Sequence, residues 1–127
     1  MIADYVQQYY VEYDKYFKRQ ELKFEFAEMG GDAARCYQLD FSDLLAGGKK
    51  IVFSTRLNKH TAKEIESVTY HELTHCLCNV RDHDDRKLPD GCPASMMNTY
   101  TLADACLVKH EKLYKRDIKL KCQKGKL

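Results

Sequence analysis

Aromatic side chains recur at helical spacing in the first segment of the chain. Between positions 3 and 19 they follow one another mainly at steps of three and four residues, at Tyr5, Tyr9, Tyr13, Tyr16 and Phe17. This spacing places them on one face of an α-helix. The pattern therefore predicts an amphipathic helix over residues 3–19 whose aromatic face packs into the core.

Alternation of apolar and polar residues, the pattern of a half-buried β-strand, follows this helix. Three segments show it: residues 21–28, 35–41 and 50–54. In the first of them, Leu22 and Phe24 share one face while Lys23 lies on the other. We expect three strands that form one small, mostly antiparallel sheet.

The next segment carries start and stop signals for a helix. Thr61 followed three residues later by Glu64 is a capping box, in which each side chain binds a backbone N–H group that the helix leaves unpaired. Asn79 tolerates the left-handed conformation in which helices commonly end. The pattern predicts a central helix from Thr61 to about Cys78. Its apolar residues cover so wide an arc that most of this helix should be buried.

A loop with Asp, Pro and Gly residues at 81–95 precedes a last periodic segment at 101–120. The spacing of Leu102, Cys106 and Leu113 predicts a closing helix whose apolar face weakens toward its end. The predicted order is helix, strands, helix, loop and helix, which is an α+β fold. No repeat, proline-rich linker or low-complexity stretch interrupts the chain, so residues 1–127 are expected to form a single domain.

The composition is that of a globular domain. The 127 residues are 44% hydrophobic and 31% charged, and no apolar run approaches the roughly 18 residues of a membrane span. The charge is uneven, because residues 109–127 hold eight Lys or Arg residues against Glu111 and Asp117. We expect this basic tail to be a solvated helix end, so that its removal after Leu120 should cost little stability.

The six cysteines are an even number, and the sequence leaves their state open. Residues 1–20 contain no apolar signal region, so the chain as written is expected in the cytoplasm with free thiols. The alternative is the mature fragment of an exported protein with disulfides. One such bond could join Cys36 on a strand to Cys76 on the buried face of the central helix.

The central helix contains the motif His71-Glu72-Leu73-Thr74-His75. Residues four apart on a helix are separated by about 6 Å along the axis and about 40° around it, so both imidazoles can reach one Zn²⁺ while Glu72 lies beside them. A third histidine, His83, follows in the loop. Three imidazoles and a glutamate that is not a ligand are the composition of a catalytic zinc site with an open fourth position.

Two other sources of the third ligand stay open beside the preferred His83. One is an aspartate carboxylate of the loop, at Asp82, Asp84 or Asp85. The other is an acidic residue of the last segment, Glu111 or Asp104.

Around this motif the chain resembles the metzincin clan of zinc peptidases, and more closely small bacterial proteins with a motif like H-E-L-G-H-C followed by H-D and S-I-M-N. The matching segments are HELTHC at 71–76, HDD at 83–85 and CPASMMN at 92–98. The resemblance implies a minimal metzincin-like zinc peptidase fold, in which Met97 forms a turn whose thioether packs beneath the metal. Two features depart from that pattern. His83 lies eight residues after His75 instead of six, and Cys78 stands at the position of the usual glycine.

Together these features predict a zinc-dependent peptidase, an endopeptidase more than an exopeptidase, that hydrolyses a peptide or protein substrate with Glu72 as general base. The alternative is a non-catalytic, zinc-stabilised binding module, although stability alone does not require Glu72. Nucleic-acid binding is not favoured, because Tyr114 is the one aromatic residue within the basic tail. The protein is expected to be a monomer without a membrane span.

Overall fold

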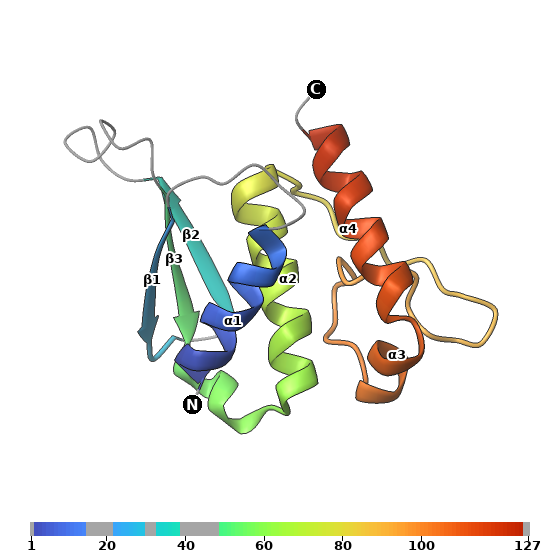
Figure 1. The fold of residues 1–127 in the computed structure, drawn as a ribbon, viewed down its shortest axis with the longest axis horizontal. Coiled ribbons are helices and arrows are strands. Elements are labelled where there is room, and N and C mark those ends of the chain that lie inside the picture. The colour runs from blue at the N-terminus through green and yellow to red at the C-terminus, as the bar shows by residue number, and fades with distance from the viewer. Residues whose placement is uncertain (1, 15–21, 30–32, 39–48, 126–127) are drawn as a thin grey trace.

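The computed structural model describes residues 2–14, 22–29, 33–38 and 49–125. Its elements are, in chain order, α1 (Ile2–Asp14), β1 (Leu22–Ala27), β2 (Ala34–Gln38), β3 (Lys49–Ser54), a 3₁₀ turn (Thr55–Lys59), α2 (Ala62–Cys78), α3 (Asp104–Lys109) and α4 (Glu111–Gly125). Figure 1 shows α2 in the middle, with the sheet on one side of it and α4 on the other. The predicted α+β class is confirmed. In the described part of the chain, no helix is long and apolar enough to cross a bilayer.

The sheet is mixed, with strand order β1-β3-β2, so the prediction of a mostly antiparallel sheet is wrong. β3 pairs antiparallel with β2 and parallel with β1, and Ile51 lies opposite Cys36 on one side and Phe24 on the other. The reason lies in the side chains of β3. Ile51, Val52 and Phe53 are all buried, which is typical of a central strand covered on both faces. β3 therefore takes the middle position and separates the two strands that precede it.

The aromatic face of α1 packs into the core, as its spacing predicts. Tyr9 and Tyr13 are buried, and the Tyr13 ring lies 5.4 Å from the ring of Tyr70 on α2. Tyr5 lies at the edge of this face and keeps 37% of its surface exposed. The rest of the predicted helix, including Tyr16 and Phe17, lies outside the described residues.

The last periodic segment forms two helices in place of one, and α4 continues well past Leu120. Tyr114, Ile118 and Cys122 are buried at successive steps of four residues, so they form one stripe that packs into the core. The expectation that the chain after Leu120 contributes little is therefore wrong. The apolar face of α4 does not weaken there, because the small apolar side chain of Cys122 continues it.

All six cysteines are paired, so of the two states that the sequence leaves open the structure has the disulfide-bonded one. Cys36–Cys76 joins β2 to α2, as the alternative reading of the sequence allowed. Cys78–Cys122 joins the end of α2 to α4, and Cys92–Cys106 joins the preceding loop to α3. Two of the three bonds thus hold α2 directly, one from each side. Connectivity of this kind arises from packing and cannot be deduced from the count of cysteines.

Candidate metal centre

The helix that carries the histidine motif is held at both ends by the residues that predicted it. The Thr61 hydroxyl accepts a hydrogen bond from the Glu64 N–H at 3.1 Å, and the Glu64 carboxylate accepts one from the Thr61 N–H at 3.2 Å. At the other end, Asn79 adopts the left-handed conformation with φ of 56°. These two caps set where α2 starts and stops.

The three predicted ligands come together. Each of His71, His75 and His83 offers a ring nitrogen, and these nitrogen atoms all lie within 4.8 Å of one another. The Nε2 atoms of the two helical histidines are 3.0 Å apart. The ring of His83 has its centroid 5.2 Å from the centroid of each helical ring. The loop after α2 thus brings the third imidazole against the helical pair.

Backbone carbonyl groups orient both helical imidazoles. Nδ1 of His71 donates to the carbonyl oxygen of Met96 at 2.7 Å, and Nδ1 of His75 donates to the carbonyl oxygen of Val80. A carbonyl oxygen can only accept, so the proton of each neutral ring sits on Nδ1. The two Nε2 lone pairs then face each other, an arrangement that a shared cation stabilises.

Burial keeps these rings in the neutral form that a metal requires. Burial lowers the pKa of His71 to about 4, against the opposing hydrogen bond to Met96. It lowers the pKa of His75 as well, and the neighbouring His83 acts in the same direction. Near neutral pH both lone pairs are therefore available without the loss of a proton.

Four of the five acidic alternatives to His83, all but Asp82, are engaged elsewhere. Asp84 binds Arg86 and Lys121, and these hydrogen bonds hold the pKa of its carboxyl well below the usual range. Both carboxylate oxygens of Asp85 accept hydrogen bonds from Thr99. In the last segment, Asp104 accepts a hydrogen bond from Thr61, and Glu111 pairs with Lys63 and Lys115. Among the described acidic residues of these two groups, none joins the histidine cluster.

A turn at residues 95–98, here called the Met97 turn, lies against the same cluster. Met97 is fully buried, and the Asn98 N–H donates to the carbonyl oxygen of Ser95 to close the turn. The neighbouring Met96 supplies the carbonyl that orients His71. The turn is thus part of the centre through its backbone, while the packing of the Met97 thioether beneath a metal stays a prediction.

A small cavity of about 80 Å³ opens beside His71 and Glu72. Its other walls are formed mainly by short side chains, including Ala33, Ser67 and Thr101. Tyr100 borders the cavity with 79% of its surface exposed. Glu72 and His71 therefore face a space that a small group of a ligand can enter.

A second group of potential ligands consists of Asp90, Cys92 and His110, which sequence spacing did not indicate because the last two lie on different segments. Cys92 is bonded to Cys106 and offers no thiolate. Asp90 is already paired with His110 at 2.7 Å and with Lys109 at 2.8 Å. In this oxidised state the group is an ion-pair cluster, and the three histidines remain the better metal centre.

The fold is α+β, and the three histidines form a candidate metal centre. The SprT-like family matches residues 2–89, and the chain belongs to this family. Proteins of this family are associated with zinc and with metallopeptidase-like domains. No curated protein and no solved structure matched the chain. The family match ends before the Met97 turn, so the closer metzincin resemblance stays a prediction.

Proposed function

We propose that this protein is a zinc-dependent peptidase in which His71, His75 and His83 bind Zn²⁺ and Glu72 is the general base. The observation that carries the proposal is the convergence of three imidazoles, two of them fixed with their Nε2 lone pairs face to face. The membership of the SprT-like family supports it. Hydrolysis of peptide bonds is the reaction that this set of residues suits best.

In this proposal each residue of the motif has a separate task. When bound, zinc supplies Lewis acidity, which activates water and polarises a peptide carbonyl. Glu72 lies on the same stretch of α2 as two ligands and borders the same cavity as His71. Its carboxylate accepts a proton from the attacking water and then delivers that proton to the departing amine. The three histidines hold the metal and exchange no proton.

The substrate we propose is an extended segment of a peptide or protein. β2 is the outer strand on the side of α2, and Ala33, immediately before it, lines the cavity beside His71. An extended chain can add to such a sheet edge through backbone hydrogen bonds and pass the metal centre. This mode of binding places substrate residues on both sides of the scissile bond, which favours an endopeptidase.

The metal centre is tested by zinc content. Purified wild-type protein should contain one Zn²⁺ per chain, and His75→Ala should lose most of it, because the remaining imidazoles hold zinc far less tightly. His60→Ala is a matched control, since His60 is exposed and hydrogen-bonds Glu64 away from the cluster. Elemental analysis that finds equal zinc in wild type and His75→Ala would contradict the site.

We further propose that the protein works in an oxidising compartment, in the manner of an exported protein. The support is the pairing of all six cysteines, two bonds of which hold the helix of the metal centre. Disulfides persist outside the reducing cytosol. Protein purified from its natural host and denatured without a reductant should show no reactive thiols, against six after reduction. A full set of thiols in the unreduced sample would exclude this compartment.

A further inference from the structure

We propose that Lys121 and Asp117 on α4 are positioning residues of the metal centre. This inference rests on the proposed function, because it concerns how the third ligand and the Met97 turn are held. It assigns a role to a helix that lies beyond the part matched by the SprT-like family. Among the described residues, no hydrogen bond or ion pair joins either of them to the histidines. Their effect is transmitted through Asp84 and Ser95.

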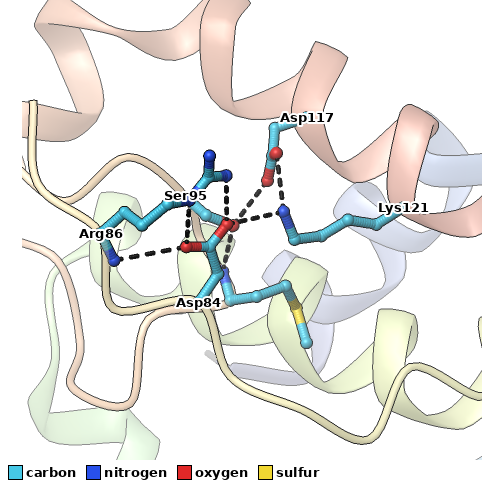
Figure 2. A network of polar contacts seen from close by, with 6 residues as sticks. Asp84, Arg86, Ser95, Asp117 and Lys121 are labelled. Atoms are coloured by element: carbon cyan, nitrogen blue, oxygen red, sulfur yellow. Dashed lines mark hydrogen bonds and ion pairs between the residues drawn. The ribbon is translucent and has the colours of Figure 1, made fainter.

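Lys121 joins two carboxylates that come from different parts of the chain. Its ammonium group lies 2.9 Å from an oxygen of Asp84 and 2.8 Å from an oxygen of Asp117 (Figure 2). The other oxygen of Asp117 accepts a hydrogen bond from the Ser95 hydroxyl at 2.6 Å. That hydroxyl in turn accepts one from the Met97 N–H at 2.9 Å. One residue of α4 thus reaches the loop after α2, and the other reaches the Met97 turn.

Both connections end next to a proposed metal ligand or next to a residue that hydrogen-bonds one. Asp84 follows His83 directly in the chain. The hydrogen-bonded ion pair between Lys121 and Asp84 therefore restrains the backbone that carries the third imidazole. The Asp84 N–H also donates to the carbonyl oxygen of Met97 at 2.9 Å. The preceding carbonyl, that of Met96, orients His71. The network therefore links the exposed third ligand to one of the two half-buried helical ligands.

The side chains that make these ion pairs and hydrogen bonds are largely shielded from solvent, unlike those of ordinary surface ion pairs. The side chains of Asp84, Asp117 and Lys121 are only 12%, 17% and 20% exposed, and Ser95 is fully buried. Solvent screening, which makes exposed pairs worth little, is reduced at such positions. Each carboxylate also has further partners, since Arg86 binds Asp84 and Ser95 binds Asp117.

The network is not needed to attach α4 to the rest of the protein. The Cys78–Cys122 bond and the buried side chains of Tyr114 and Ile118 already fasten this helix. Removing the charge of Lys121 should therefore leave the fold in place and change the metal centre. That separation makes the positioning role testable.

The test compares Lys121→Met with Lys119→Met, which removes the same charge from an exposed position of the same helix. Lys121→Met should weaken zinc binding by about 10- to 100-fold, as loss of an indirect support of a ligand does. It should also shift the visible absorption spectrum of the Co²⁺-loaded protein, which reports ligand geometry. Lys121→Arg should restore most of the affinity, because a guanidinium group can bind both carboxylates. The thermal unfolding of the metal-free variants should match that of Lys119→Met.

Zinc affinity and a cobalt spectrum of Lys121→Met equal to those of Lys119→Met would overturn the inference, provided wild type binds zinc and His75→Ala does not. A wild type without zinc would instead overturn the proposed function and this inference with it. If Lys121→Met does not fold, Asp117→Asn keeps the shape of the side chain and removes its charge. It should weaken zinc binding in the same direction, and unchanged binding in this variant would also overturn the inference.

Discussion

Replacement of Glu72 by glutamine should abolish peptide hydrolysis while leaving the zinc content and the fold unchanged. The amide of the introduced side chain has nearly the same shape as the carboxylate but cannot accept the proton of the attacking water. General base catalysis is worth about 10²- to 10⁴-fold in rate, so kcat should fall by about that factor. Turnover of an unfolded protein substrate, measured beside elemental analysis, checks both parts of this expectation.

Glu64→Gln is the matched control for this variant. Glu64 lies on the same helix, and glutamine can replace glutamate in its capping box, so the substitution should keep both activity and zinc. Two results would count against the proposed role of Glu72. If Glu72→Gln is as active as the control, Glu72 is not the general base. Zinc binding by wild type without any hydrolysis of peptides would favour the non-catalytic binding module.

Local signals allowed α2 and its motif to be predicted closely. The capping box at Thr61 and Glu64, the left-handed Asn79 and the four-residue spacing of His71 and His75 are properties of adjacent residues. Local geometry determines such features, so sequence reasoning finds them. The residue type of His83 and its position in the loop predict that it joins the same cluster, and the structure brings its ring there.

The order of strands in the sheet could not be predicted by the same means. Alternation showed that three strands exist, but it does not say which of them is central. β1 and β3 pair in parallel across a long separation in sequence, and the choice depends on how completely β3 is buried. The groups that orient His71 and His75 were also hidden from sequence reasoning. They are the carbonyl groups of Met96 and Val80, which any residue type would supply.

The pairing of the cysteines is a further feature that the sequence does not predict, because cysteine can form disulfides and can also pack as a small apolar side chain. Six cysteines allow fifteen complete pairings, and spacing alone does not choose among them. Here Cys76 and Cys78 point from α2 toward opposite partners, β2 and α4. Cys76, Cys78 and Cys122 are also buried, so they fill part of the core. The segment whose charge pattern predicts a solvated helix end therefore contains a buried and covalently bonded side chain, that of Cys122.

Ending the chain after Leu120 should therefore lower the free energy of unfolding by about 4 kcal/mol, in contrast to the expectation from charge pattern alone. The truncation removes Cys122, whose bond to Cys78 spans a sequence separation of 44 residues. Constraint of a loop of that size in the unfolded chain contributes about 4 kcal/mol in the chain-entropy account. Urea unfolding under oxidising conditions measures the difference.

A chain that ends after Gln123 is the matched control, because it loses most of the remaining tail but keeps Lys121 and Cys122. It should unfold at nearly the urea concentration of the full chain. Cys122→Ser distinguishes the effect of losing the disulfide from the effect of shortening the chain, because it breaks the bond while all residues of α4 remain. If Cys122→Ser and the chain ending at Leu120 are both as stable as the control, the bond does not stabilise the fold. In a reducing buffer the control should lose its advantage over Cys122→Ser, because the covalent link is then absent from both chains.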